Sequence, residues 1–195
     1  MQKPIDHTKL NQALQLLQEQ LELADAPRSE IVVCGGSALI AIGLVSRTTR
    51  DIDIVALLHN GRLQQSEPLP RHLVEAAAAV QEILHLPADW LNCGPASQLN
   101  MGLPEGFCSR LHKVEIGSKL VVHYIDRTDQ IYFKTFASAD RGGYHILDLK
   151  ALKPTDDELY LAAKWCMGQD ISEGFRFIMK EMLTQSGWTH VAERI

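Results

Sequence analysis

Hydrophobic residues recur at helical spacing in two segments of the N-terminal half. Between residues 8 and 24, leucines three or four positions apart are separated by Gln and Glu, which predicts an amphipathic helix. A second helix is expected from Pro70 to Leu86, where apolar residues form one stripe and include an alanine run. We expect the first helix to cover a sheet and the second to pack closely against a neighbour.

Strand patterns lie between and after these helices. Ile31–Val33 is β-branched and predicts a buried strand, and residues 51–57 alternate with a period of two. Residues 111–116 and 119–125 flank Gly117-Ser118, which favours a hairpin with a type II′ turn.

Two segments are expected to be loops. Residues 59–70 are rich in Gly, Gln, Ser and Pro, and residues 87–109 carry Pro, Gly and Asn around one tryptophan. Trp90 is expected to anchor the second loop in the core. Asp89 and Asn92 are interpreted as residues that hold turns in the backbone.

Helical signals dominate the C-terminal part. One helix is expected from Thr128 or Asp129 to about Ala139, with Lys134 turned away from its buried stripe. A capping box at Thr155–Glu158 begins another, and Ser172 caps the last. The sequence therefore predicts an α/β (α+β) fold with a mixed sheet in residues 1–126 and a helical lobe in residues 127–195.

Composition sets limits on the function. The 195 residues are 46% hydrophobic, which is ample for a packed core, and the formal charge of −5 argues against extended, sequence-independent binding of nucleic acid. No apolar run approaches a membrane span, and the start is not a secretory signal, so a cytoplasmic protein is expected. The four cysteines lack CxxC spacing and are interpreted as reduced thiols.

A glycine turn follows the first strand. Gly35-Gly36-Ser37 permits tight turning and close approach of another group, and Ser37 is expected to cap a short helix over residues 38–44. Backbone N–H groups at the start of a helix are suited to binding phosphate oxygens.

Two aspartates follow after thirteen intervening residues. The period of two puts Asp51 and Asp53 on one face of the strand and Ile52 and Ile54 on the other. Such a pair is costly to hold together unless a cation neutralises it, and Mg²⁺ (or Mn²⁺) prefers carboxylate oxygens completed by substrate phosphates. Either motif alone is common in ordinary turns and strands, but their spacing favours a metal-nucleotide site.

These residues carry a family resemblance. Gly36-Ser37, thirteen residues and Asp51-Ile52-Asp53-Ile54 resemble the motif of the DNA polymerase β-like nucleotidyltransferase superfamily. GGSAL ahead of T-x-DID resembles its small bacterial branch related to abortive-infection and toxin-antitoxin nucleotidyltransferases. Residues 129–134 and 144–149 are similar to a later lysine and aspartate of that branch.

The resemblance implies a set of site residues and a fold. The fold would be a nucleotidyltransferase core, with the predicted hairpin beside the aspartate strand. The superfamily's third carboxylate would come from Glu115 or, second in rank, Asp126. The implied roles are catalysis by Asp51, Asp53 and Lys134; nucleotide binding by Gly35, Gly36, Ser37, Arg47 and Asp148; and metal binding by Asp51, Asp53 and Glu115.

Two functions from different classes follow. The first is transfer of a nucleoside monophosphate from an NTP to an acceptor hydroxyl, on an RNA 3′ end such as that of tRNA or on a protein, in a toxin partnered by an antitoxin. The second is a non-catalytic nucleotide-binding or partner-binding protein that retains the fold, favoured by the ambiguous third carboxylate. No membrane partner is expected.

Overall fold

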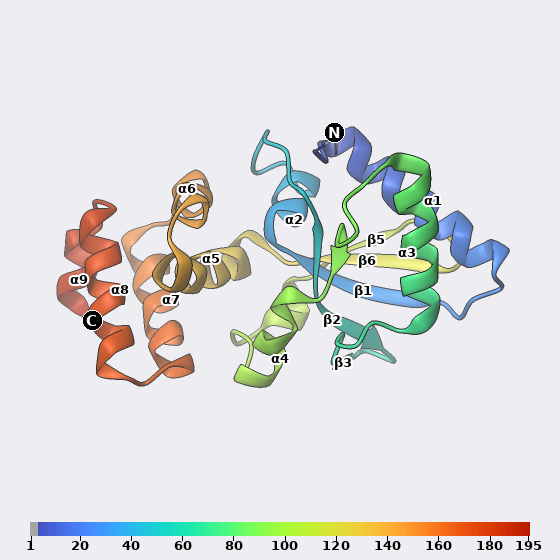
Figure 1. Ribbon diagram of the computed structural model, residues 1–195. Helices are drawn as coiled ribbons and strands as arrows, with labels where there is room; N and C mark the ends of the chain where they lie inside the picture. The colour runs from blue at the N-terminus through green and yellow to red at the C-terminus, as the bar shows by residue number, and fades with distance from the viewer. Residues whose placement is uncertain (1–3) are drawn as a thin grey trace. The chain divides into compact units, whose positions relative to one another are not determined.

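The structure, a computed structural model, describes residues 4–195, which form two compact units. The first unit comprises the described residues up to Leu103 together with Cys108–Ile125 (Figure 1). The second comprises Pro104–Phe107 and Asp126–Ile195. The combination of a mixed sheet with several helices confirms the predicted α/β (α+β) class.

A six-stranded mixed sheet organises the first unit. Its order is β3-β2-β1-β6-β5, with β4 paired to β2 outside this path. β1, the middle strand of this path, is antiparallel to β2 and parallel to β6, which makes the sheet mixed. The strands are β1 (Ser29–Cys34), β2 (Ile52–His59), β3 (Arg62–Gln64), β4 (Leu91–Asn92), β5 (His112–Glu115) and β6 (Leu120–Tyr124).

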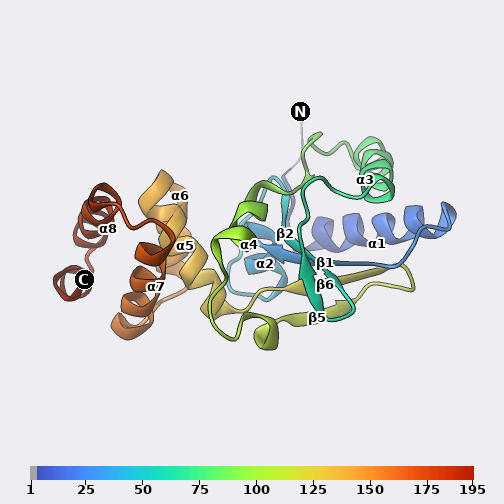
Figure 2. The ribbon, with the colours of Figure 1, turned by 90° about the horizontal axis from the view of Figure 1, so that it is seen from below.

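Two long helices cover one face of this sheet. α1 (His7–Leu23) and α3 (Arg71–Leu84) lie on the same side of the strands (Figure 2). Their leucines form one core with sheet residues such as Ile31 and Ile54, as the sequence predicted. The unit also contains α2 (Gly35–Ala41), α4 (Ser97–Met101) and a 3₁₀ helix, Gly94–Ala96. A second 3₁₀ helix, Phe107–Arg110, has its first residue in the second unit and the others in the first.

The hairpin differs from its prediction in two respects. β6 pairs with β1, so β1 separates the hairpin from the aspartate strand. Residues 116–119 connect the strands, and Gly117 lacks the positive φ that a type II′ turn requires. Gly117 is needed for space instead, because a Cβ there would lie 2.6 Å from Gln18 Cδ.

Both predicted loops contain elements that the pattern did not reveal. Asn60 and Gly61 adopt φ values of 50° and 73°, which suits a type I′ turn, and join β2 to β3. The second loop includes β4, α4 and the 3₁₀ helices. Trp90 does anchor it, since the ring is 1% exposed and Nε1 donates to the Ala77 carbonyl at 3.0 Å.

The second unit is built from helices. These are α5 (Arg127–Arg141), α6 (Tyr144–Ala151), α7 (Asp156–Gln169), α8 (Glu173–Gln185) and α9 (Thr189–Arg194). The capping box of Thr155 with Glu158 and the Ser172 cap are both present. The predicted orientation of Lys134 is wrong, because this side chain is buried on the same face of α5 as Ile131 and Ser138.

Candidate functional site

The glycine turn is the first turn of a helix. α2 begins at Gly35 with Cys34 as its N-cap residue, so Ser37 lies inside the helix and does not cap it as predicted. The buried Ser37 hydroxyl donates to the Cys34 carbonyl at 3.3 Å. The helix starts earlier than expected because β1 runs directly into it without an intervening loop.

Both glycines are required by groups from the aspartate segment. Gly35 has φ +70°, and a Cβ on it would collide with the Asp53 carboxylate. A Cβ on Gly36 would lie 2.8 Å from Thr49 Oγ1 and 3.0 Å from Arg47 Nη2. The two motifs predicted from the sequence therefore meet in space.

The aspartate segment lies at the start of β2, where Asp53 points away from the core face of the sheet. Ile52 and Ile54 belong to the core beneath the helices, and the alternation along β2 places Asp53 on the opposite face, at the level of Cys34. Asp51 immediately precedes the strand, and its Oδ1 accepts a hydrogen bond from Thr49 Oγ1 at 3.3 Å.

Thr49 is itself fixed by the start of the chain. Its backbone N–H donates to the Ile5 carbonyl at 2.8 Å, and its carbonyl accepts from Ile5 at 2.7 Å. Ile5 is fully buried. The neighbouring Arg47 donates from Nη1 to the Thr48 carbonyl at 2.8 Å, which holds its guanidinium along the same loop. The structure thus brings Gly35, Gly36, Arg47, Asp51 and Asp53 together around Thr49.

The donor set at this position is incomplete for a metal cage made only of protein groups. Within residues 4–195, no three or more His, Cys, Asp or Glu side chains group as a metal site. Mg²⁺ is usually held by one or two carboxylates, with water and substrate phosphates completing its shell. Asp51 and Asp53 fit this second arrangement.

Glu115 does not belong to the site. It lies on the edge strand β5, where it pairs with Val121 of β6. Val121 pairs in turn with Glu30 of β1, which is four residues before Cys34, the partner of Asp53. The register therefore separates it from Asp53 by about 13 Å along the strands and about 14 Å across three strand spacings.

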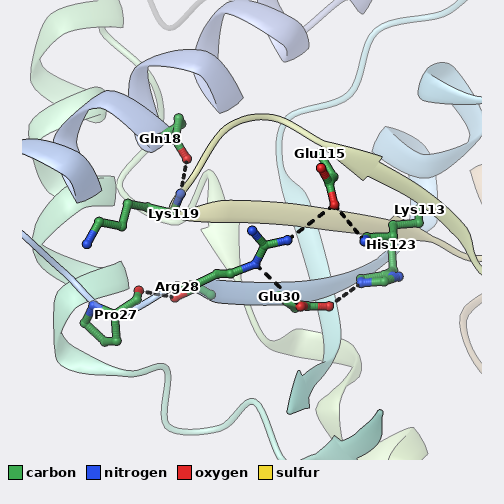
Figure 3. A network of polar contacts seen from close by, with 9 residues as sticks. Gln18, Pro27, Arg28, Glu30, Lys113, Glu115, Lys119 and His123 are labelled. Carbon is green, nitrogen blue, oxygen red and sulfur yellow. Dashed lines mark hydrogen bonds and ion pairs between the residues drawn. The ribbon is translucent and has the colours of Figure 1, made fainter. Parts of the chain in front are cut away.

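The partners of Glu115 confirm a different role. Its carboxylate contacts Lys113 Nζ at 2.7 Å and Arg28 Nη2 at 3.4 Å (Figure 3). The hydrogen bond from Lys113, its charge and that of Arg28 lower the pKa of Glu115. In the same network, Glu30 accepts from His123 at 2.8 Å if Nε2 carries the proton. Glu115 is therefore an ion-pair residue of the sheet, and its predicted delivery to the aspartates is wrong.

The remaining predicted residues lie in the second unit. Asp126 is the N-cap of α5 and accepts from the Thr128 N–H at 2.8 Å. Lys134 Nζ contacts Asp148 Oδ2 at 2.7 Å, with both side chains at least 94% buried. The structure therefore pairs Lys134 with Asp148, two residues that the resemblance had nominated separately.

A pocket of about 530 Å³ lies at the C-terminal end of α2. Arg47 borders it as well as the aspartate site. Its lining consists of Asp6, His7, Ile40, Gly43, Leu44, Val45, Ser46 and Arg47.

Thr49 and Ile5 are two residues of the site whose roles were not predicted from the sequence. The available signal for Thr49 was its place two residues before Asp51, which suits a short side-chain contact across the turn. Ile5 carries no local signal, because its contribution is a backbone bridge to a residue 44 positions later.

A glycine turn facing an aspartate on a mixed sheet is the arrangement that the resemblance to nucleotidyltransferases predicts. The chain belongs to the family described as "Nucleotidyltransferase of unknown function (DUF6036)", whose model matches residues 9–159. This assignment supports the nucleotidyltransferase superfamily and leaves the branch unspecified. Searches of curated proteins and of solved structures found no match. None of the helices in the described residues is both long and apolar enough to cross a membrane.

Proposed function

We propose that the protein transfers a nucleoside monophosphate from an NTP to an acceptor hydroxyl in a Mg²⁺-dependent reaction. The observation that carries this proposal is the packing of the Asp53 carboxylate against Gly35, with Asp51 tied to Thr49 beside Gly36. The family description supports the general activity.

Each residue of the site has a role in this proposal. Asp51 and Asp53 would hold Mg²⁺ or Mn²⁺, which when bound would neutralise the charge of the triphosphate. Gly36 and Ser37 would offer first-turn N–H groups of α2, which have no acceptor inside the helix. Arg47, beside Gly36, would add positive charge at the outer phosphates.

The chemistry needs little else from the protein. The acceptor hydroxyl oxygen attacks the α-phosphorus and loses its proton to solvent, a new P–O bond forms, and the bond to the pyrophosphate leaving group breaks. Catalysis of this kind relies on positioning and charge neutralisation. We place the acceptor hydroxyl on an RNA 3′ end or on a protein, in a toxin that is neutralised by an antitoxin partner.

Lys134 and Asp148 enter the proposal as a coupled pair. The ammonium of Lys134 is already neutralised by Asp148, so contact with a phosphate would require the lysine to share or exchange that partner. A lysine in this role acts as a point charge on the nucleotide.

One observation favours the second function, a non-catalytic nucleotide-binding or partner-binding protein. The third carboxylate expected on β5 is used in an ion-pair network elsewhere on the sheet. Two acids suffice to bind a metal-nucleotide complex, whereas two-metal catalysis needs more ligands.

Label transfer separates the two functions. The full chain is incubated with each α-³²P-labelled NTP, Mg²⁺ and total cell RNA or protein, next to the Asp51→Asn/Asp53→Asn variant. Asp156→Asn, at an exposed position on α7, is the matched control. Labelling that is lost in the double variant and kept in the control supports the transferase. Nucleotide binding without transfer supports the second function as a nucleotide-binding protein. Absence of both binding and transfer would exclude the transferase and leave only the partner-binding form of the second function.

A further inference from the structure

A two-residue strand brings an unassigned side chain beside the aspartates. β4 pairs in parallel with the start of β2, with Leu91 opposite Ile52 and Asn92 opposite Asp53. The N–H of Ile52 also donates to the Trp90 carbonyl at 2.6 Å, just before the paired residues.

The pairing fixes the direction in which Asn92 points. Leu91 and Ile52 both belong to the core beneath α1 and α3. Successive side chains of a strand alternate between faces, and directly paired residues share a face. Asn92 therefore lies on the same face as Asp53, one strand spacing of about 4.8 Å away.

Two hydrogen bonds orient the carboxamide of Asn92. Its Oδ1 accepts from the Gly94 N–H at 2.8 Å, and its Nδ2 donates to the Asp89 carbonyl at 3.3 Å. A carboxamide nitrogen carries two hydrogens, so one donor remains after the contact with Asp89. The buried Trp90 locks the segment that carries this group, which is the support that a binding residue needs.

We infer that Asn92 is a nucleotide-binding residue whose Nδ2 donates its second hydrogen to a phosphate oxygen of the NTP held at Asp53. An amide is suited to this position, because it donates to an anion without placing a third negative charge beside the two aspartates. The inference rests on the proposed function, and it assigns the 89–92 segment a purpose beyond holding a turn.

Replacement of the amide by a hydroxyl tests this role. Asn92→Ser retains an oxygen that can accept the Gly94 N–H in the same kind of turn, but lacks the second donor. Loss of one hydrogen bond to a charged group should weaken binding of a non-hydrolysable NTP with Mg²⁺ about tenfold, measured by isothermal titration calorimetry. The melting temperature should stay close to that of the wild type. Asn92→Thr, which suits a strand better, serves the same test if the serine variant does not fold.

Two comparisons make the outcome decisive. Asn11→Ser, at an exposed position of α1, should bind the nucleotide like the wild type. If Asp53→Asn abolishes binding while a folded Asn92 variant binds within twofold of the wild type, Asn92 only holds its turn and the inference fails alone. If Asp53→Asn leaves binding unchanged, the proposed function fails and the inference fails with it.

Discussion

At the scale of single residues, the site depends on two glycines that have no side chain. Gly35 and Gly36 have no Cβ, which leaves room for the Asp53 carboxylate and for Thr49. The start of α2 can therefore approach the aspartate segment more closely than larger residues at these two positions would allow. Thr49 then connects the glycine turn to Asp51 through one hydroxyl contact. The space at Gly35 and Gly36 is therefore needed for the observed positions of Asp53 and Thr49.

Gly36→Ala should test this dependence. The added methyl group would lie 2.8 Å from Thr49 Oγ1 and 3.0 Å from Arg47 Nη2, so the loop must shift away from α2. We expect a loss of about 1–3 kcal/mol in the free energy of unfolding, as is typical of overpacking. Label transfer should fall at least tenfold, by analogy with the cost of misplacing catalytic groups.

The matched control for that variant is Gly168→Ala. Nothing lies within 4 Å of a Cβ at this position of α7. Alanine should stabilise a helix position by about 0.5–1 kcal/mol and leave transfer unchanged. Equal transfer by the Gly36 and Gly168 variants would show that the approach at Gly36 is not required for activity.

At the scale of elements, local patterns predicted those elements that form from their own periodicity. α1 and α3 carry long apolar stripes, and β1 and β2 carry β-branched or alternating residues. β4 left no such signal, because two residues form a strand only through their pairing with β2. Asn60-Gly61 did offer a turn signal, which the composition of the surrounding loop obscured.

The order of the strands was not predictable from periodicity. The strand pattern predicted the hairpin that carries Glu115, and the family resemblance placed this hairpin beside the aspartate strand. A periodic pattern by itself does not say which strand is the neighbour. In the sheet, β1 and β6 lie between the two acids. The glycine and aspartate motifs were predictable because a short connection joins them in the chain, and Asn92 was not, because its neighbour is 39 residues away.

Gly117→Ala should measure how the hairpin is fixed to α1. A methyl group would lie 2.6 Å from Gln18 Cδ, and the buried Gln18 side chain cannot move freely because its Oε1 accepts from the Lys119 N–H at 3.0 Å. We expect urea unfolding to show a loss of about 1–3 kcal/mol. In a Gln18→Ala background the same substitution should cost much less, and an unchanged cost would contradict the contact.

At the scale of the whole molecule, stability should depend on pH through His72. Its Nε2 lies 2.8 Å from Ser29 Oγ, and burial lowers the pKa of His72 below its usual value of 6.5. The unfolded chain therefore binds this proton more readily than the folded protein does. Below pH 6.5 the unfolded state gains protons first, so the free energy of unfolding should decrease as the pH falls toward the folded pKa.

Urea unfolding between pH 7.5 and pH 5 measures this effect. His72→Gln retains an acceptor for the Ser29 hydroxyl and does not titrate, so its stability should change less over this interval than that of the wild type. Glu158 should not contribute to the change, because the interval stays above its ordinary pKa of 4.5. Its pKa in the folded protein is lower still, mainly because of the hydrogen bond from Arg127. Identical pH profiles for both proteins would remove His72 as the cause.

The buried pair of Lys134 and Asp148 allows stability to be separated from function. Lys134→Met alone should cost about 3–5 kcal/mol, because the Asp148 carboxylate would remain buried without its cation. Lys134→Met/Asp148→Leu removes both charges and should recover most of that stability in urea unfolding. If Lys134 contacts a phosphate of the nucleotide, the double variant should still lack label transfer although it is folded. A double variant that is stable and fully active would assign Lys134 and Asp148 to the packing of the second unit alone, and the transferase site would then consist of residues from the first unit.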